Sequence, residues 1–551
     1  MDTRVRTESL NVSTRRMVEG LADASTSGGT FSAFDDRHAL LAERLIEQMT
    51  AAADKAPEPE AIDRGLEVAC SYVGVLSEAL LRFAVRGFLA DRRALTARAA
   101  FDEVVRPSPM ATLREPDTRE DALMRWRERL NFHHDDWHNV YRWRNRWTSG
   151  HPQGEHFLHM HQQMLAYYDA ERLSLGLGRI APWTLTEVIP YRHESLPRSG
   201  GRTREAGKLI DSDARADVIE DVKTRRLLRD NFDVPPWFTE AGDGTKDPVQ
   251  ENSEHNGGAT KLSEFRSAHA LGATIENPYH NVGHMLVASL TSSMPGDYDD
   301  MGDTFCSHRD AVFWGWHKHI DDLSTRWQEL QHASAPEETP ALVRQRLTPT
   351  DPAHDSPDIV FRVSDPEGLG QLTDPKFELG ELAPERWSLR LMSDEALLCG
   401  RGFSFYYRVE SQSDEAQSLT GKLFLVPQDY RSDRRAWINL DSFNVQLGPH
   451  ERQVIARSAG DFSVLYHGRE DGLQYGWPPE ILLPAPGDYT ALLLLCPANL
   501  GGHGGHEHGG HGEVKDMRLG YPFDRTWPES VEATLAKANY AATLNVRLRL
   551  P

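Results

Sequence analysis

Cysteine is scarce in this chain of 551 residues, and long hydrophobic runs are absent from it. The four cysteines stand singly and form no CxxC pair, which argues against a disulfide-stapled secreted protein. No run approaches the roughly 20 apolar residues of a membrane helix, and the N-terminal residues lack the apolar core of a signal peptide. We therefore expect a cytoplasmic protein with no membrane partner. The apolar run 491–496, ALLLLC, is expected to be a buried strand.

Positive charge is also in short supply. The chain has 61 basic and 83 acidic side chains, a formal charge of −22, which disfavours nucleic acid and anionic membrane surfaces as partners. Neutral or cationic small molecules remain open as ligands. Hydrophobic residues make up 39%, enough for true cores, and the length suggests about three or four domains at roughly 150 residues each.

Histidine, in contrast, is abundant and clustered: the chain has 24 histidines against 15 tyrosines. In NFHHDDWHNVY, His134 and His138 are four residues apart, so on a helix both imidazoles lie on one face. In NPYHNVGH, His280 and His284 repeat the spacing, and Pro278 fits the start of that helix. One such pair is more often packing than ligation.

Each pair is followed by a helical stretch with further histidines. Residues 154–177 supply His156, His159 and His161, and residues 301–323 supply His308, His317 and His319. Because a pair plus a later histidine occurs twice, the sequence predicts two metal ions, each bound by three imidazoles. Imidazoles without an obligatory carboxylate favour copper over magnesium, manganese or a carboxylate-bridged di-iron site. Zinc accepts imidazole too, so a di-zinc hydrolase stays open, although no HExxH is present.

The pattern of apolar residues divides the chain. Residues 1–30 are polar and expected to be disordered, while 31–115 and 116–345 have mainly helical spacing. Residues 346–551 contain short β-rich segments separated by turn residues, as in an antiparallel sandwich. Within them lies a Gly/His-rich loop, 501–512. Two further stretches are expected to be loops: His193–Arg204 and Gly242–Gly258.

The histidine segments resemble those of the arthropod hemocyanin and prophenoloxidase family of type 3 dicopper proteins. HHDDWHNVY and GEHFLHMHQQMLAYYDAERLSLGL resemble the two segments of its first copper site, and YHNVGH and RDAVFWGWHKHIDD those of its second. FSAFDDRHALLAERLIE resembles the family's N-terminal helical domain. INLDSFNVQLGPHERQVIARSAGDFSVLYHG, GWPPEILLPAPG and MRLGYPFDR resemble its C-terminal β-domain, so the resemblance runs from about Phe31 to Arg525.

The resemblance implies a multidomain α+β fold. Its parts are a helical N-terminal domain, a central helical-bundle dicopper domain, and a C-terminal antiparallel immunoglobulin-like β-sandwich. It also implies the ligands of two copper ions: His134, His138 and His161 for one, and His280, His284 and His317 for the other. The neighbouring histidines then serve in packing or behind the ligands.

The activity implied by the resemblance is that of a phenoloxidase, which uses two copper ions and O2 to oxidise phenols, o-diphenols or aminophenols to quinones. A monophenol has a pKa near 10, so it needs a base to dock on a metal. Asn281 resembles an asparagine that orients such a base, and Asp303 is the candidate base itself, with a helix N-cap as the alternative role.

A rival reading of the same site is a reversible dioxygen carrier or sensor. In the family a phenylalanine of the first domain can cover the coppers, and FSAF supplies Phe31 and Phe34 as candidates for such a gate or for the core. Family members form dimers or hexamers, which leaves a homo-oligomer open. The loop with His503, His506, His508 and His511 has no counterpart in the family and is either a weak metal chelator or a solvated insertion.

Overall fold

The computed structural model describes the chain with gaps, mainly over residues 31–92, 119–138, 153–210, 265–291, 298–330, 403–464, 477–497 and 530–549. The loops expected at 242–258 and 501–512 lie outside the described residues, as does nearly all of the segment 1–30. The described residues form two compact units. One comprises 1–157, 181–320 and 467–475, and the other comprises 158–180, 321–466 and 476–551.

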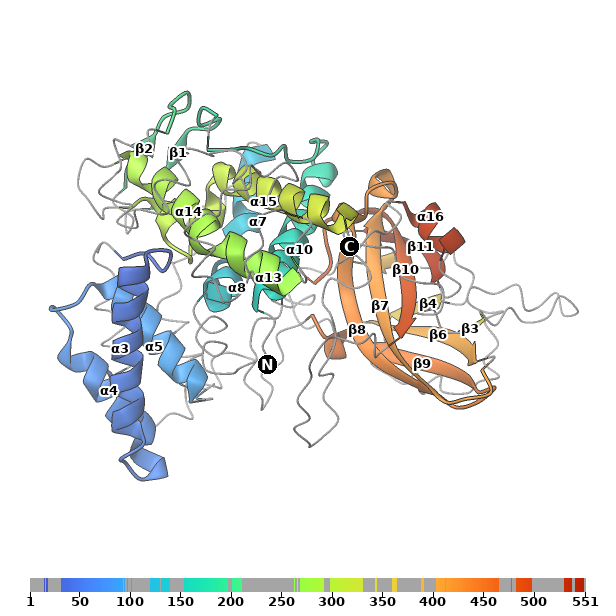
Figure 1. Ribbon diagram of the computed structural model, residues 1–551, viewed down its shortest axis with the longest axis horizontal. Helices are drawn as coiled ribbons and strands as arrows, with labels where there is room; N and C mark the ends of the chain where they lie inside the picture. The colour runs from blue at the N-terminus through green and yellow to red at the C-terminus, as the bar shows by residue number, and fades with distance from the viewer. Residues whose placement is uncertain are drawn as a thin grey trace, which may run out of the picture. The chain divides into compact units, whose positions relative to one another are not determined.

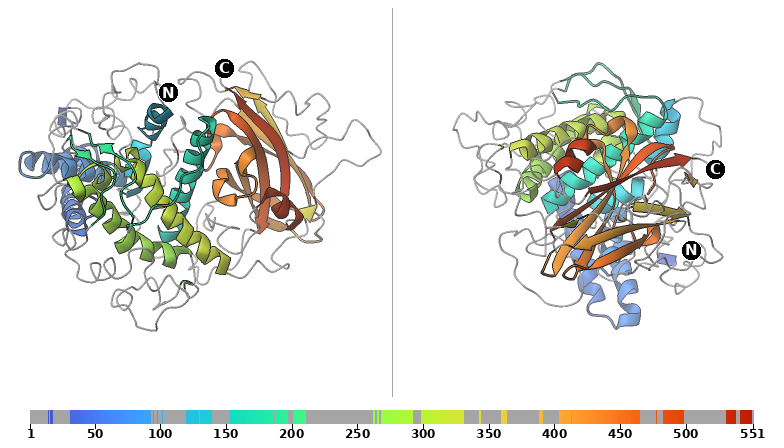
Figure 2. Two further views of the ribbon diagram at one scale, coloured as in Figure 1. Left: turned by 90° about the horizontal axis from the view of Figure 1, so that it is seen from above. Right: turned by 90° about the vertical axis from the view of Figure 1, so that its right-hand side faces the viewer.

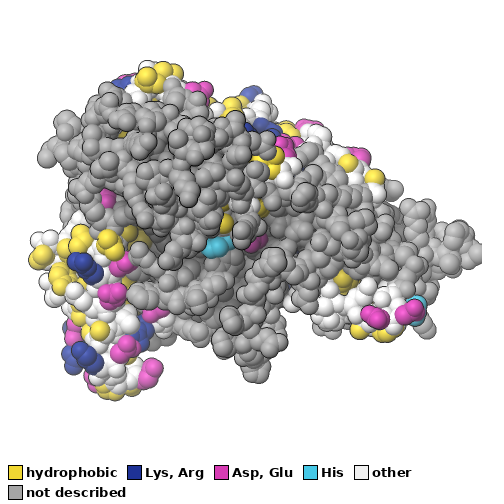
Figure 3. Space-filling view, in the orientation of Figure 1, with side chains coloured by type: hydrophobic (Ala, Val, Ile, Leu, Met, Phe, Trp, Pro, Cys, Tyr) yellow, Lys and Arg dark blue, Asp and Glu magenta, His cyan; other side chains and the backbone are white. Residues whose placement is uncertain are grey.

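Three helices at the beginning of the first unit share a hydrophobic core. They are α3 (Asp36–Ala53), α4 (Ala61–Ser71) and α5 (Glu78–Asp91). Apolar residues at three- and four-residue spacing, among them Leu45, Met49, Leu66 and Phe88, pack inward. Ser77 caps α5 by accepting a hydrogen bond from the Leu80 N–H at 3.3 Å. The outward faces of α3 and α4 carry interspersed basic and acidic side chains (Figure 3).

The helices that carry the paired histidines follow. Their bounds are α7 (Arg119–Glu128), α8 (Asn131–Asp136), α10 (Gln153–Ser174), α13 (Ala268–Thr274), η7 (Ile275–His280), α14 (Asn281–Ala288) and α15 (Ala311–Leu330). Single helical turns η8 (Ser289–Thr291), η9 (Asp300–Gly302) and η10 (Ser307–Arg309) connect α14 to α15. Figure 1 shows α13, α14 and α15 in green to yellow.

Pro278 does not begin a helix, contrary to the expectation from its position before His280. It lies inside η7, a π-helical turn that joins α13 to α14 without a break. Proline has no N–H and cannot complete the usual i to i−4 bond, and a π-turn is one way to absorb that loss within a helix. The turn expected to begin a helix therefore lies in the middle of a helical segment that runs from α13 to α14.

Glycines allow two close helix contacts in the first unit. Gly154, at the start of α10, faces Gly272 of α13, and a methyl group at either position would overlap the other helix's backbone. Gly283 of α14 lies against the indole of Trp316 of α15, where a methyl group would overlap the ring. Small residues at these points set the spacing of histidine-bearing helices.

The stretch His193–Arg204, expected to be a mobile loop, contains a small antiparallel hairpin. Strands β1 (His193–Glu194) and β2 (Thr203–Arg204) pair in it, with His193 opposite Arg204. Arg204 is fully buried. Its partners come from residues about a hundred positions away, so the local sequence gave no sign of them.

The second unit contains two sheets (Figure 1 and Figure 2). The five-stranded sheet has the order β5 (Ser388–Arg390), β11 (Ala541–Arg549), β10 (Gly487–Pro497), β7 (Gln417–Pro427) and β8 (Ile438–Leu447). All its pairs are antiparallel except β11 with β5. In the other sheet, β6 (Phe403–Ser411) pairs with β3 (Leu342–Val343), β4 (Ile359–Val363) and β9 (Arg452–Ser458).

The core of the five-stranded sheet involves α16 (Val531–Lys537). Leu492, Leu494 and Cys496 of β10 pack with Val531 of this helix. The strand expected at 491–496 is thus confirmed and buried. Among the described residues, no helix has the length and apolar character needed to cross a bilayer. The described cysteines, Cys70, Cys306 and Cys496, are in no disulfide bond.

Candidate metal centre

The first histidine pair lies at the end of α8. His134 and His138 are both buried, and their Nε2 atoms are 3.2 Å apart. The helix widens into a π-turn at residues 137–138. The Nδ1 atom of His134 lies 2.6 Å from the carbonyl oxygen of Thr304. The four-residue spacing therefore places two imidazoles with their Nε2 atoms facing each other.

The second pair straddles the junction of η7 and α14. The Nε2 atoms of His280 and His284 are 3.1 Å apart, and both side chains are fully buried. Nδ1 of His284 lies 2.9 Å from the carbonyl oxygen of Met301, and Nδ1 of His280 lies 3.0 Å from Oδ1 of Asn281. His317 of α15 completes this group. Its Nε2 is 2.9 Å from that of His280.

Hydrogen bonds to backbone carbonyls fix which nitrogen carries the proton in three of the rings. A carbonyl oxygen can only accept, so Nδ1 of His134, His284 and His317 must donate; the acceptor of His317 is the Phe313 carbonyl at 2.7 Å. A neutral imidazole then presents a lone pair at Nε2. Two facing lone pairs repel rather than bond. In contrast, two nitrogens bound to one tetrahedral metal at 2.0–2.1 Å would stand about 3.3 Å apart. The donor set fits a metal ion.

His161 lies on α10, whose residue Phe157 packs edge-on against His280 with ring centroids 4.8 Å apart. The helix is continuous, so His161 follows Phe157 by one turn on the same face. Potential ligand atoms lie within 4.8 Å of one another in two overlapping groups, namely His134, His138 and His161, and His161, His280 and His317. The second group contains His161 in place of the predicted His284, whose Nε2 lies 3.1 Å from that of His280.

Phenylalanine rings surround these imidazoles. Phe313 packs against His317 at 3.8 Å and against His134 at 5.2 Å, measured between ring centroids. Burial in this apolar setting lowers the pKa of His284 to about 4, although the Met301 carbonyl opposes the shift. His284 is therefore neutral near pH 7 and keeps its Nε2 lone pair for a metal.

The two phenylalanines of FSAF lie in different surroundings. Phe34 stacks on His284, with centroids 4.1 Å apart and planes 18° apart, and its edge meets His138 at 4.9 Å. Phe31 instead packs on Phe83 of α5 and stacks on His38. Of the two candidates, Phe34 is the one in contact with the imidazoles, whereas Phe31 belongs to the core of the N-terminal helices.

Asn281 and Asp303 also make different contacts. Asn281 is buried; its Oδ1 accepts from His280, while its amide nitrogen has no hydrogen-bond partner among the described residues. Asp303 accepts the Phe305 N–H at 2.9 Å and forms an ion pair with Arg82 at 3.4 Å. Asp303 is the residue that follows η9, whereas the N-cap residue of η10 is Cys306.

The histidines beside the ligand positions make other contacts. His156 stacks on Trp137, His319 hydrogen-bonds the Tyr279 hydroxyl at 3.0 Å, and His308 lies against Phe313. Burial, the largest cause, holds the pKa of His308 well below its usual value, and the nearby Arg309 charge acts in the same direction.

Sequence reasoning missed a buried arginine on α5. Arg86 is fully buried and forms ion pairs with Asp135 and Asp136, which lie between the first two histidines. Asp135 also accepts the Thr304 hydroxyl at 2.6 Å. A signal was present: in LLRFAVRGF, Arg82 and Arg86 occupy one face of an otherwise apolar helix, and a buried cation requires an anion.

Two family models match the part of the chain that contains these histidines. Residues 92–203 match the family model described as "Hemocyanin, copper containing domain", and residues 178–330 match "Common central domain of tyrosinase". Hemocyanin II of Limulus polyphemus is 25% identical over 470 residues, 72% of this chain and 69% of that protein. Phenoloxidase 8 of Anopheles gambiae is 29% identical, over 69% of this chain and 59% of its own. Cyclopenase asqI of Emericella nidulans is 23% identical, over 76% and 62%.

Solved structures share the fold. The crystal structure of AsqI has a TM-score of 0.63 at 18% identity and covers 98% of this chain and 99% of its own, and AsqI with Zn has a TM-score of 0.60 at 16% identity over the same shares. A hemolymph-type prophenoloxidase from a crustacean has a TM-score of 0.60 at 15% identity and covers 98% of this chain and 91% of its own.

The expectation of a cytoplasmic protein is wrong. The similar prophenoloxidase is of hemolymph type, and hemolymph is an extracellular fluid. Scarce cysteine does not report the compartment here. A chain of 551 residues buries enough apolar surface to fold without disulfides, so their absence carries no information about redox conditions.

Proposed function

The chain belongs to the family of arthropod hemocyanins and phenoloxidases, and from that premise we propose that it is a dicopper oxidase. Its substrates in this proposal are phenols, o-diphenols or aminophenols, which it oxidises to quinones with O2. The observation that carries the proposal is two groups of facing imidazoles. The Nε2 atoms of His134 and His138 are 3.2 Å apart, and that of His280 lies 3.1 Å from that of His284 and 2.9 Å from that of His317.

The proposed ligands are His134, His138 and His161 for one copper, and His280, His284 and His317 for the other. Bound copper would supply the electrons that reduce O2 and the positive charge that holds a phenolate. The chain itself fixes the rings through Nδ1, so the Nε2 donors are oriented before any metal arrives.

Phe34 is proposed as the gate. Its ring lies parallel to His284 in the position where a flat aromatic substrate would stack. A phenol must therefore displace Phe34, whereas dioxygen is small enough to pass. The Phe34 N–H donates to Ser32 Oγ at 3.2 Å, and the adjacent Asp35 accepts the Tyr298 hydroxyl at 3.3 Å, which holds the turn in place.

Asn281 is proposed to orient the phenol or a water molecule. Its Oδ1 is occupied by His280, which leaves a buried amide N–H group to donate to an oxygen of the substrate or of water. Asp303 remains the proposed base. Its ion pair with Arg82 stabilises the carboxylate, so we expect Asp303→Asn to change the pH profile of monophenol oxidation more than that of catechol oxidation.

The decisive experiment is metal analysis followed by an aerobic assay of the copper-loaded protein with monophenols, catechols and aminophenols. The proposal predicts two copper ions per chain and quinone formation that is lost in His161→Ala. Two bound coppers with no product from any of these substrates would refute the oxidase.

The alternative from another class is a reversible dioxygen carrier or sensor. The hemocyanins among the relatives and the coverage of His284 by Phe34 support it. It predicts reversible absorbance changes on adding and removing O2, without quinone from added catechol.

A third candidate keeps zinc in place of copper. Imidazole donors suit zinc equally, a cyclopenase is among the relatives, and one similar structure was solved with zinc. This candidate predicts that the protein purified without added metal contains zinc, and that zinc alone supports a reaction that consumes no O2.

The layout beyond the metal centre is part of the proposal. We propose the domains 31–115, 116–345 and 346–551, the last an immunoglobulin-like sandwich formed by the two sheets. A homo-oligomer is proposed by analogy with the family, and light scattering would test it.

A further inference from the structure

One short segment holds a ligand of each proposed metal position. Residues 298–310, here called the carbonyl segment, run through η9 and η10. The Met301 carbonyl accepts the Nδ1–H of His284 at 2.9 Å, and the Thr304 carbonyl accepts that of His134 at 2.6 Å. These two carbonyls are three residues apart, so a shift of this backbone would displace both imidazoles and thereby affect both proposed metal positions.

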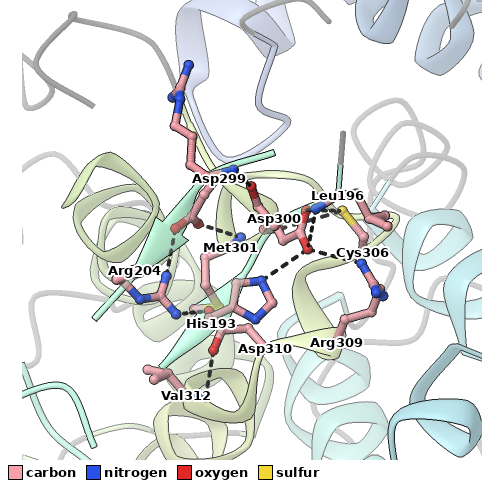
Figure 4. Close-up of polar contacts among 12 residues, drawn as sticks. His193, Leu196, Arg204, Asp299, Asp300, Met301, Cys306, Arg309, Asp310 and Val312 are labelled. Atoms are coloured by element: carbon pink, nitrogen blue, oxygen red, sulfur yellow. Dashed lines mark hydrogen bonds and ion pairs between the residues drawn. The ribbon is translucent and has the colours of Figure 1, made fainter. Parts of the chain in front are cut away.

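Asp300 anchors the segment from within. It is fully buried, and Figure 4 shows donors converging on its carboxylate from three directions. The backbone N–H of Leu196 donates at 3.1 Å, Arg309 at 3.2 Å, and the Cys306 thiol at 3.4 Å. Nε2 of His193 lies 3.0 Å away. The backbone carbonyl of Asp300 also accepts the Asp303 N–H, which closes the turn that carries Met301.

Neighbouring carboxylates extend the anchor. Asp299 accepts the Met301 N–H at 3.0 Å and forms an ion pair with Arg204 at 2.8 Å. Arg204 also pairs with Asp310, whose other oxygen accepts the Val312 N–H at 3.0 Å at the start of α15. Through α15 the cluster reaches His317. The whole arrangement is visible around Met301 in Figure 4.

We propose that Asp300 is a positioning residue that couples the two metal positions, because the turn it anchors presents one carbonyl to each. This inference rests on the proposed metal centre, whichever metal fills it. The carboxylate matters because its donors include Arg309, which is also buried. The other anionic partner of Arg309, Glu128, is 3.4 Å away and partly exposed, so an amide at position 300 would remove the buried partner of this charge.

The test is Asp300→Asn in the full chain, with zinc ion as the probe. Zinc undergoes no redox change, so competition with a coloured chelator reports both affinities. Changes behind a ligand typically weaken metal binding 10- to 100-fold, and we expect a loss of about tenfold or more at both positions together.

Asp441→Asn is the matched control. Asp441 is a fully buried carboxylate of β8 in the second unit, which accepts from Arg457 at 2.7 Å and from the Ser463 N–H at 2.8 Å. We expect it to lower the unfolding midpoint but to leave both zinc affinities unchanged. If Asp300→Asn behaves in the same way, or weakens one position alone, the inference is wrong.

A milder variant covers the case in which Asp300→Asn does not fold. His193→Leu keeps the carboxylate and removes one donor, and we expect a smaller, parallel loss at both positions. Unchanged affinities in a folded His193→Leu would then overturn the inference. If the unaltered protein itself fails to bind two ions, the proposed metal centre fails instead, so the two failures are distinct.

Discussion

At the scale of single residues, Phe34 stacks on His284, and we propose that an aromatic substrate must displace its ring. Exposing a buried phenylalanine ring to water costs about 2 kcal/mol. We therefore expect Phe34→Ala to lower the KM for catechols by roughly tenfold or more, because the substrate no longer has to displace the ring. Initial rates across catechol concentrations would measure this.

Phe31→Leu provides the control for Phe34. Phe31 packs against Phe83 away from the imidazoles, so its replacement should lower the thermal midpoint and leave KM unchanged. Equal KM values in Phe34→Ala and the unaltered protein would show that the ring is not a gate.

A second residue-scale prediction concerns pH. Burial, the largest cause, raises the pKa of Asp299 to about 7, although Arg204 opposes the shift. Between about pH 4 and 7 the folded protein then holds a proton that the unfolded chain has released. Stability should fall as pH rises through that window, by at most about 1.4 kcal/mol per pH unit. Asn cannot titrate, so Asp299→Asn should lack this slope.

The measurement is the difference in thermal midpoint between the unaltered protein and Asp299→Asn from pH 4 to 8. As pH rises, the thermal midpoint of the unaltered protein should fall relative to that of Asp299→Asn. The difference should become constant above about pH 8. If the midpoint of the unaltered protein instead rises relative to that of Asp299→Asn, the ion pair with Arg204, and not burial, determines the pKa of Asp299.

At the scale of elements, the spacing of α14 and α15 depends on Gly283. A methyl group there would overlap the Trp316 indole, so Gly283→Ala must push the helix carrying His280 and His284 away from the helix carrying His317. Overpacking of this kind typically costs 1–3 kcal/mol. We also expect weaker zinc binding at the position shared by these helices.

Gly178→Ala is the matched control, because a methyl group there meets nothing within 4 Å. It should leave the unfolding midpoint and the zinc affinity unchanged. If Gly283→Ala loses stability without losing affinity, the glycine serves packing alone.

What the sequence predicted at this scale follows from local rules. The four-residue spacing of His134 and His138 and of His280 and His284 is a helical period, and it suffices to place each pair on one face. The buried strand at 491–496 is equally local. The π-turn at Pro278 was missed because a proline in a helical pattern is more often read as a helix start. The hairpin at His193–Arg204 was missed because the partners of its buried arginine, Asp299 and Asp310, lie far along the chain.

The same limit applies to the residues behind the ligands. Nothing in the local pattern joins Asp300 to Leu196, or Thr304 to Asp135, which lies 169 positions away. The proposed ligands are histidines at a recurring spacing, which the sequence shows. The groups that hold the imidazoles in place are backbone carbonyls and single ion pairs, which leave no pattern in the sequence. Only the arginines of LLRFAVRGF gave a sequence signal of such support.

At the scale of the whole molecule, metal should stabilise the fold. An ion that binds only the folded chain adds about 2.7 kcal/mol at a free concentration one hundred times its Kd. We expect copper or zinc to raise the thermal midpoint by several degrees and a chelator to reverse the rise. In His317→Ala the rise should be smaller. If neither copper nor zinc changes the thermal midpoint, the proposed metal centre is contradicted.

The division into units also belongs to this scale. The expected boundary at residues 115 and 116 falls inside the first unit, where Arg82 and Arg86 of α5 form buried ion pairs with Asp303, Asp135 and Asp136. Residues 158–180 and 321–330 group with the strands of the second unit. Such groupings arise from contacts between residues far apart in the chain, and the spacing of apolar residues along the sequence does not predict these contacts.

The meeting of Gly154 with Gly272 sets how closely α10 approaches α13. Any larger residue at either position would drive the two helices apart, and Phe157 would move with α10 away from His280. The absence of side chains at these two glycines thus affects the positions of imidazoles with which the glycines have no contact. A designer who wished to widen the centre without changing any donor would begin with these glycines.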